Sequence, residues 1–157
     1  MRLRPFAVIL LSTLLLSACG GGMVRRVSDP AASVQQLTVN LDGSWTLELR
    51  LQNYSSIPMR YDRLRLQLGV DGQDAGTVEA APAISIGPES ADVLSVPLRP
   101  ASAARIAVAD ALAGGRTLDY TLKGSIAATP EDKKPRSFEL DARNALSPVP
   151  GLQGVLR

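Results

Sequence analysis

Apolar and polar residues alternate along several short stretches of this chain, and this period of two limits the fold more than any other feature. In residues 45–53 an apolar side chain stands at every second position from Trp45 to Leu51, with polar residues between them. Successive side chains of a strand point to opposite faces, so this stretch predicts a strand with one buried face. The same alternation predicts further strands at residues 34–40, 61–70, 77–80, 92–98, 117–127 and 138–142.

Turn residues separate these predicted strands. Asp71 and Gly72 form a pair that is typical of a tight turn, directly after the strand 61–70. The polar residues 129–136 predict a hairpin loop before the last strand. Within that loop, residues 131–134 carry charges of both signs, which indicates either a soluble hairpin tip or a docking site.

The alanine-rich residues 100–115 interrupt the alternation and predict a helix. Ser102 is its candidate N-cap, and Gly114 and Gly115 predict its end. Apolar residues spaced four positions apart give the helix one apolar side. We therefore expect it to cover an open end of the sheets.

Short strands with one apolar and one charged face stabilise a protein by pairing two sheets across a shared core. We therefore expect an all-β fold, an antiparallel β-sandwich of about seven strands with one short helix. Residues 34–146 would form this domain, which is enough chain to bury more than about 60% of its unfolded surface. Residues 147–157 would form a flexible C-terminal tail, the alternative being an edge strand offered to a partner.

The first residues have the three parts of a secretory signal: Arg2 and Arg4, an apolar stretch at 6–16, and small residues before Cys19. As a helix, the apolar segment would reach only about 21 Å, which is short of the roughly 30 Å hydrocarbon core of a bilayer. Residues 1–18 are therefore predicted to be a cleaved signal peptide rather than a membrane span.

The tetrad Leu16-Ser17-Ala18-Cys19 resembles the bacterial lipobox, at which signal peptidase cuts before a cysteine that carries lipid. The resemblance implies that Cys19, the single cysteine, carries diacylglycerol and a further acyl chain such as palmitate. Stable anchoring takes at least two lipid signals, which this modification supplies. Gly20 follows, where inner-membrane lipoproteins usually have aspartate, and this implies an outer-membrane protein facing the periplasm. The alternative is a small apolar cysteine at the end of an ordinary signal.

Residues 19–33 lack apolar periodicity and are predicted to be the lipidated cysteine and a flexible tether. Such a tether would span roughly 20 Å and lift the domain clear of the lipid headgroups. Arg25 and Arg26 either rest on anionic headgroups or belong to a solvated linker.

Five short motifs together resemble a known family. They are Leu49-x-Leu51-x-Asn53, Ile57-Pro58-Met59, Asp71-Gly72, Val96-Pro97-Leu98 and Tyr120-x-Leu122-x-Gly124. Over residues 34–142 the chain resembles the group 2 late embryogenesis abundant proteins, also named for the water stress and hypersensitive response (WHy) domain. The resemblance implies an immunoglobulin or fibronectin III-like sandwich, a role in desiccation or stress tolerance, and no catalytic residues. The residues of structural importance would be Asn53, Pro58, Asp71, Gly72, Tyr120 and Gly124.

One motif departs from that family. The family's Asn-Pro-Asn at the end of a strand is Asn53-Tyr54-Ser55 in this chain. A proline would fix the backbone as the chain leaves the strand. Here the same task is left to packing and to side-chain hydrogen bonds from Asn53, Ser55 or Ser56.

The composition excludes several kinds of chemistry. The chain has no histidine, which excludes Ser-His-Asp and Cys-His nucleophile systems and imidazole metal ligands. Without Arg2 and Arg4, 15 basic residues face 15 acidic ones, so no basic excess remains for nucleic acid. We therefore expect no enzyme, no cofactor, no metal and no nucleic-acid partner, and no small-molecule substrate is evident.

Two groups of carboxylates are the remaining chemical candidates. Asp71 and Asp74 suggest a calcium loop, although turn chemistry explains them better. Asp119, Glu139 and Asp141 could lie on neighbouring strands as an acid pair, although outward strand positions are usually just solvated.

These features predict a noncatalytic outer-membrane lipoprotein. It would be held to the membrane by its N-terminal lipid and would bind or protect proteins or envelope components, in desiccation or stress tolerance. The alternative is a structural subunit of an envelope or secretion assembly, which docks a sheet edge or the helix on a dedicated protein partner.

Overall fold

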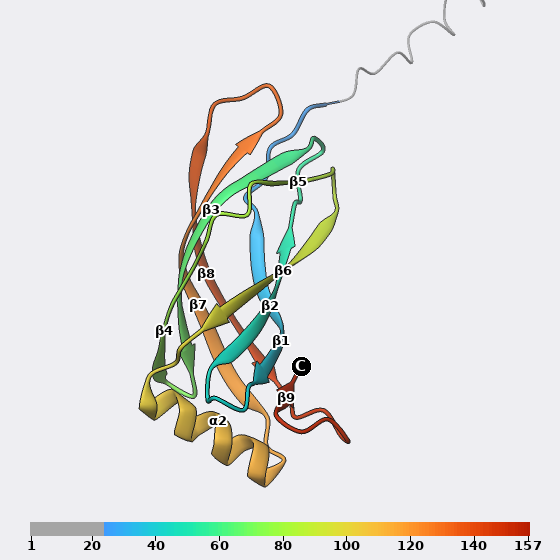
Figure 1. Cartoon of the computed structure of the whole chain (residues 1–157). Helices are drawn as coiled ribbons and strands as arrows, with labels where there is room; N and C mark the ends of the chain where they lie inside the picture. The colour runs from blue at the N-terminus through green and yellow to red at the C-terminus, as the bar shows by residue number, and fades with distance from the viewer. Residues whose placement is uncertain (1–23) are drawn as a thin grey trace, which may run out of the picture.

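The computed structural model describes residues 24–157, and the predicted signal peptide lies outside them. This part of the chain contains nine strands and one helix (Figure 1). They are β1 (Ala31–Val39), β2 (Trp45–Gln52), β3 (Met59–Val70), β4 (Gln73–Ala80), β5 (Ile84–Ile86), β6 (Ala91–Leu98), α2 (Ser102–Gly114), β7 (Leu118–Pro130), β8 (Arg136–Leu146) and β9 (Val155–Leu156). Within the described range, no helix has the length and apolar character needed to cross a membrane.

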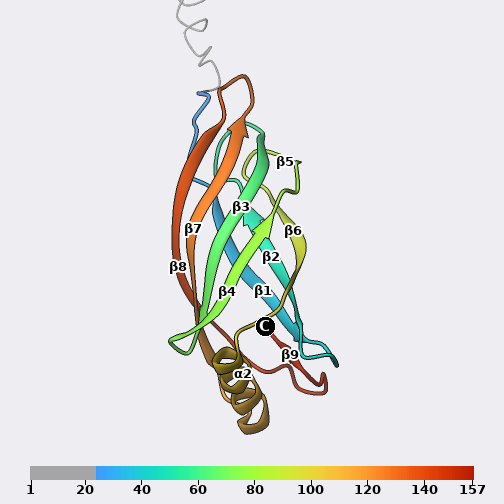
Figure 2. The same ribbon diagram turned by 60° about the vertical axis from the view of Figure 1, so that its left-hand side comes forward.

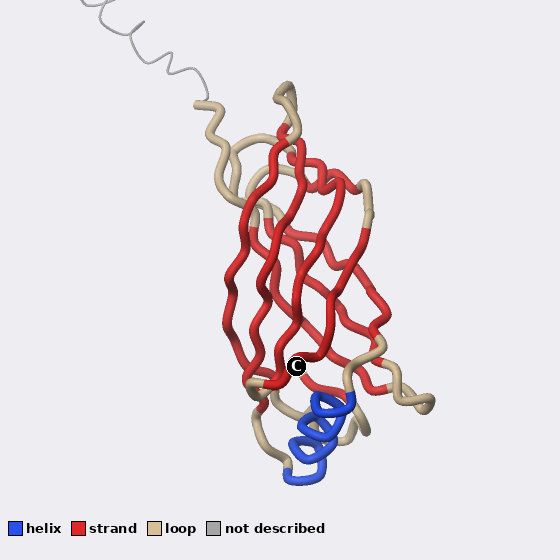
Figure 3. Tube along the Cα trace, turned by 90° about the vertical axis from the view of Figure 1, so that its left-hand side faces the viewer, coloured by secondary structure: helices blue, strands red, loops and turns tan. Residues whose placement is uncertain are grey.

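The strands form two antiparallel sheets that pack face to face (Figure 1 and Figure 3). One sheet has the order β6-β2-β1-β9, and the other has the order β4-β3-β7-β8, with β5 paired to the first residues of β3. The predicted all-β antiparallel sandwich with one helix is confirmed, and each of the predicted strands is present. Sequence alternation missed β5 and β9 because strands of three and two residues are too short to show it.

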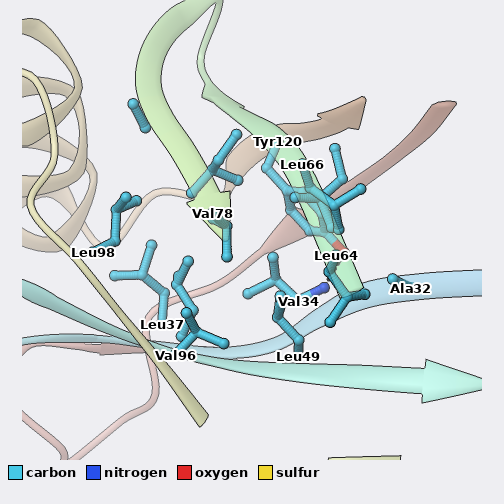
Figure 4. Packing of buried hydrophobic residues seen from close by; sticks show 14 of the residues in the cluster. Ala32, Val34, Leu37, Leu49, Leu64, Leu66, Val78, Val96, Leu98 and Tyr120 are labelled. Carbon is cyan, nitrogen blue, oxygen red and sulfur yellow. Dashed lines mark hydrogen bonds between the residues drawn. The ribbon is translucent and has the colours of Figure 1, made fainter. Parts of the chain in front are cut away.

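The alternating apolar residues of both sheets fill the space between them. Trp45 and Leu51 of β2 are buried as predicted, and so is Phe138 of β8. Figure 4 shows labelled side chains of both sheets in one shared space: Ala32, Val34, Leu37, Leu49, Val96 and Leu98 from the first sheet, and Leu64, Leu66, Val78 and Tyr120 from the second. Burying one large apolar side chain contributes about 1.5–3 kcal/mol, so this continuous core dominates the stability of the fold.

Two buried tyrosines join the sheets. The hydroxyl of Tyr61 in β3 donates to the backbone carbonyl of Gln52 at the end of β2, at 2.8 Å. The hydroxyl of Tyr120 in β7 accepts a hydrogen bond from the backbone N–H of Val34 in β1, at 3.0 Å. Burial raises the pKa of both phenols above their ordinary value of 10.0. Each bond fixes the spacing of the sheets at one point.

The predicted turn at Asp71 and Gly72 is confirmed and joins β3 to β4. Its two residues have φ values of +45° and +77°, the pair of positive values that a type I′ hairpin turn requires. The Asp71 carboxylate accepts hydrogen bonds from the Arg116 guanidinium at 2.7 Å and from the Asp119 backbone N–H at 3.2 Å. The same carboxylate raises the pKa of Arg116. The turn is thereby tied to the chain that follows α2.

α2 packs on β4 and β3 at one end of the sandwich (Figure 1). Its buried residues are Ala104, Val108 and Ala111. Gly115 ends the helix with a φ of +61°, as predicted. The prediction that Ser102 is the N-cap is wrong, because Ala101 occupies that position and Ser102 is the first helical residue. The backbone N–H of Ala101 is bonded to the Ala75 carbonyl at 3.2 Å, which fixes where the chain turns into the helix.

The C-terminal residues 147–157, expected to form a flexible tail, are instead paired. β9 adds to β1, with Leu156 opposite Leu37. Ser147 and Arg157 exchange two backbone hydrogen bonds, at 2.6 and 2.9 Å. Two glycines with positive φ values reverse the chain between these points and return it to β1.

Candidate functional site

The segment 24–30 meets three loops at the end of the sandwich opposite α2 (Figure 1 and Figure 2). This end, termed the N-terminal pole, consists of the segment and the loops 53–58, 87–90 and 131–135. The opposite end, termed the helix pole, consists of α2 with the turns 40–44 and 71–72.

Asn53 is the centre of the N-terminal pole, and its side chain is fully buried. Its Nδ2 donates to the backbone carbonyls of Ile57, Ile86 and Gly87, at 2.9, 3.1 and 2.9 Å. Its Oδ1 accepts a hydrogen bond from the Ser55 backbone N–H at 2.8 Å. One amide therefore satisfies backbone groups from two parts of the chain, and these bonds compensate for its burial.

Ser55 and Ser56 hold the amino-terminal segment against this centre. The backbone N–H of Ser28 donates to Oγ of Ser55 at 3.0 Å. Oγ of Ser56 donates to the Val24 carbonyl at 2.8 Å and accepts from the Arg26 backbone N–H at 2.8 Å. Side-chain hydrogen bonds thus stand where the family that the motifs resemble has a proline, as the sequence predicted.

The predicted flexible tether through residue 33 does not match this arrangement. β1 already begins at Ala31, and Pro30 before it is buried. Residues 24–30 have no regular secondary structure, which explains their lack of periodicity. Their backbone groups nevertheless bond to serines about thirty positions later, and a sequence pattern cannot reveal such a contact.

Arg25 and Arg26 contact acidic residues of the same pole. The Arg25 guanidinium lies 3.2 Å from the Glu131 carboxylate and 3.0 Å from that of Asp132. The Arg26 guanidinium lies 3.4 Å from the Glu89 carboxylate. Because all these side chains are exposed, each pair contributes only about 0.2–1 kcal/mol. The mixed-charge hairpin loop therefore contacts the amino-terminal segment through its acidic half.

The remaining motif residues secure other parts of the sandwich. The Pro58 carbonyl accepts a hydrogen bond from the Glu131 backbone N–H at 2.9 Å. Gly124 of β7 lies opposite Leu66 of β3, and a Cβ at Gly124 would lie 2.2 Å from the Arg65 carbonyl oxygen. Only glycine fits at such a close approach of two strands. The motif residues Asn53, Pro58, Asp71, Gly72, Tyr120 and Gly124 therefore form no single cluster.

The predicted lipidation site stays a prediction. Cys19 and the recognition residues Leu16, Ser17 and Ala18 lie outside the described residues.

The strand carboxylates considered as an acid pair do not come together. Asp141 of β8 lies opposite Lys123 of β7, and their charged groups are 3.3 Å apart. Glu139 lies opposite Ser125 and Asp119 lies opposite Ala145, so Asp119 is paired with neither carboxylate. These residues form the polar outer face of the sheet.

The loop carboxylates Asp71 and Asp74 form hydrogen bonds that stabilise the turn after β3. Asp71 binds Arg116 as described, and Asp74 accepts a hydrogen bond from the Gly76 backbone N–H at 2.8 Å. Over residues 24–157, no group of three acidic, cysteine or histidine side chains is placed to hold a metal ion.

A depression of about 530 Å³ lies on the outer face of β3 and β7. Its lining includes Gln67, Gly69, Asp74, Asp119, Thr121 and Lys123. Ligand sites are usually concave and mostly apolar with a few convergent polar groups. Polar and charged residues make up most of the lining of this depression, and its Gln67 side chain already donates to Asp74. A depression of this kind on an outer sheet face suits contact with the surface of another molecule better than enclosure of a small molecule.

Residues 48–143, from β2 to β8, match the family model of the late embryogenesis abundant proteins, LEA_2. The match covers more than half of the chain. The chain belongs to the LEA_2 family. LEA_2 proteins are generally noncatalytic stress proteins, so membership indicates a role related to stress or desiccation. The family predicted from the five motifs is confirmed, and no curated protein matches this LEA_2 chain significantly.

Solved structures similar to this LEA_2 protein include one from a plant and one from an archaeon. A protein from Arabidopsis thaliana has 14% identity over 78% of this chain and 80% of its own, with a TM-score of 0.48. A candidate late embryogenesis abundant (LEA) protein has 18% identity over 88% of this chain and 86% of its own, with a TM-score of 0.41. A protein from Archaeoglobus fulgidus has 15% identity over 76% and 96%, with a TM-score of 0.38.

Proposed function

We propose that this LEA_2 protein is a noncatalytic outer-membrane lipoprotein, acylated on Cys19, whose WHy domain binds or protects proteins or envelope components during desiccation or other stress. The observation that carries the proposal is the LEA_2 match over residues 48–143, joined to a tetrad ahead of the domain that resembles a lipobox. The docked segment 24–30 supports it. A chain that leaves an elongated sandwich at one pole keeps both outer sheet faces available for contacts in the periplasm.

The charges on the outer faces also support a contact function. Arg65 and Glu79 pair at 3.0 Å on one side of the five-stranded sheet, and Lys123 and Asp141 pair at 3.3 Å further across it. A surface of mixed, mutually compensated charges attracts neither strongly acidic nor strongly basic partners. It remains hydrated beside many kinds of protein, which suits a protein that acts on diverse neighbours.

We also propose that the sandwich is of the immunoglobulin or fibronectin III-like kind. The support is the strand order, in which β6-β2-β1 faces β4-β3-β7-β8 and the chain crosses repeatedly between the sheets.

Two measurements test the proposal. Mass spectrometry of the mature protein from envelope fractions should find an acylated Cys19 at the N-terminus, and Cys19→Ser should release the protein from the membrane. The purified protein should then preserve a labile enzyme through drying or heating better than an equal mass of an inert globular protein. Equal loss of enzyme activity in the two samples would contradict the proposed role in stress. An unmodified Cys19 would contradict the proposed anchor.

A second function, a structural subunit of an envelope or secretion assembly, is favoured by the helix pole. Ile106 of α2 is 70% exposed, and Leu41 in the turn after β1 is fully exposed. Large apolar side chains at one end suit docking on a dedicated protein. Crosslinking in intact membranes separates the two functions, because a subunit would yield one stoichiometric partner and a protective protein a diffuse set.

A further inference from the structure

We propose that the N-terminal pole is a bilayer-facing surface. The docked segment 24–30 holds the sandwich upright, Lys133 and Lys134 lie against anionic lipid headgroups, and the helix pole points away from the membrane. This inference rests on the proposed acylation of Cys19. It concerns how the domain is held at the membrane and not whether it is anchored.

Only a short length of chain separates the lipid from the domain. The docked chain begins at Val24, whose carbonyl accepts the Ser56 hydroxyl at 2.8 Å. Five peptide links separate Val24 from Cys19. A fully extended chain covers at most about 3.6 Å per residue, so the docked end lies within about 18 Å of the acylated residue. The helix pole lies at the far end of the sandwich (Figure 1 and Figure 2).

The segment 24–30 is held on more than one side. Arg25 contacts the hairpin loop 131–135, and Arg26 contacts Glu89 of the loop 87–90. The serine hydrogen bonds of the loop 53–58 hold the backbone between and after these side chains. A segment fixed to three loops cannot swivel freely, so the short tether transmits an orientation as well as a position.

The hairpin tip carries charges of both signs. Glu131 and Asp132 both face Arg25, which partly neutralises them. Lys133 and Lys134 follow directly and are exposed, and neither forms an ion pair with any residue from 24 to 157. An anionic bilayer attracts such basic side chains within about a Debye length, roughly 8–10 Å. The tether permits this approach.

A bilayer is favoured over an acidic protein as the occupant of this surface. The covalent lipid would bring the lysines to the membrane at every encounter, whereas a protein partner would have to enter the narrow space between the pole and the lipid. Two lysines are too few to bind a membrane alone, but they suffice to bias the orientation of a domain that is already anchored.

The test uses the full acylated protein in vesicles of phosphatidylethanolamine and phosphatidylglycerol that contain a headgroup-labelled nitroxide lipid. A fluorophore is placed at the hairpin tip through Pro135→Cys, or on α2 through Ala109→Cys, since both positions are exposed and acylation occupies the thiol of Cys19. We expect strong quenching at position 135 and little at position 109. Replacing phosphatidylglycerol by phosphatidylcholine should lower the quenching at the tip several-fold.

Charge variants then identify the residues responsible. Lys133→Glu with Lys134→Glu should lower the quenching at the tip as much as the neutral vesicles do. The matched control is Arg63→Glu with Arg143→Glu, the same change of charge at two exposed arginines on strands β3 and β8. This control should leave the quenching unchanged.

Breaking the arginine contacts tests the upright orientation. Arg25→Glu with Arg26→Glu places like charges beside Glu131, Asp132 and Glu89, and should raise quenching on α2 while lowering it at the tip. Two outcomes would overturn this inference and leave the proposed anchor in place. One is equal quenching at both positions in the parent protein, and the other is quenching at the tip that depends on neither the two lysines nor phosphatidylglycerol. A protein that fails to float with the vesicles would overturn the proposed anchor and the inference with it.

Discussion

The two poles of the sandwich are closed by different interactions. The N-terminal pole contains Asn53 and Ser55, the two buried polar residues of the described chain, whereas the helix pole is closed by the apolar side of α2. Irregular loops bring backbone N–H and C=O groups into the interior without a strand partner, and a buried amide can satisfy them. A helix satisfies its own backbone groups, so apolar contact is enough to dock it. Buried polar residues therefore occur where irregular chain is packed.

The largest expected effect compares two asparagines. Asn53→Ala should lower the free energy of unfolding by about 3 kcal/mol, because it leaves several buried backbone groups without a partner. The side chain of Asn40, half-buried in the turn after β1, donates only to the hydroxyls of Ser44 and Thr46. Asn40→Ala should therefore lower stability by about 1 kcal/mol. Urea denaturation measures both, and equal losses would contradict the distinction between the poles.

Two glycines allow a second comparison, between a site where two strands approach closely and a site with open space. Gly124→Ala should lower the free energy of unfolding by about 2–3 kcal/mol, because its Cβ would meet the Arg65 carbonyl and force β3 and β7 apart. At Gly114, near the end of α2, an added Cβ would have no other atom within 4 Å, so Gly114→Ala should raise stability by up to about 0.5 kcal/mol. Thermal unfolding distinguishes a loss from a gain. A neutral Gly124→Ala would show that the strands can separate without cost.

The two tyrosine hydroxyls should make stability depend on alkaline pH. The folded protein holds the pKa of Tyr61 and Tyr120 above 10.0, the value expected in the unfolded chain. The contribution of these two hydroxyls to the free energy of unfolding is therefore fully present below about pH 10. It falls as the pH rises above that value, because the unfolded chain loses these protons first. Each Tyr→Phe change should lower stability by about 1–2 kcal/mol at neutral pH.

The same two changes together should flatten the alkaline decline. Urea denaturation at several pH values between about 8 and 11 measures it. The control is Tyr54→Phe, since Tyr54 is exposed and its loss should leave the decline in place. If stability still declines at alkaline pH in the double variant, other titrating groups cause the decline.

These comparisons also show which parts of the molecule a sequence can predict. The strands were predictable because burial of one sheet face imposes a period of two, as from Trp45 to Leu51 in β2. The turn at Asp71 and Gly72 was predictable because positive φ values restrict the residues that can occupy it. In both cases the determining interaction is local or repeats along the chain.

The N-terminal pole could be predicted only in part, because its contacts join distant residues. The family resemblance identified Asn53, and the serines beside it were expected to bond, but their partners were not identifiable. Arg25 contacts acidic residues 106 and 107 positions later, and β9 pairs with a strand at the start of the domain. No periodicity connects such positions. Their pairing follows only from the arrangement of the sheets.

A small effect is expected at the start of α2, where local propensity and the fold disagree. Ala101 has the extended backbone of an N-cap, with φ −62° and ψ 153°, but its side chain cannot accept a hydrogen bond. Ala101→Asp should raise the free energy of unfolding by about 0.5–1 kcal/mol, because the carboxylate would bond the free N–H groups and interact favourably with the helix dipole. Ser102→Ala is the control and should change stability little, since Ser102 is the first helical residue and not the cap. The opposite result in urea denaturation, a loss of about 1 kcal/mol from Ser102→Ala and no gain from Ala101→Asp, would move the cap to Ser102.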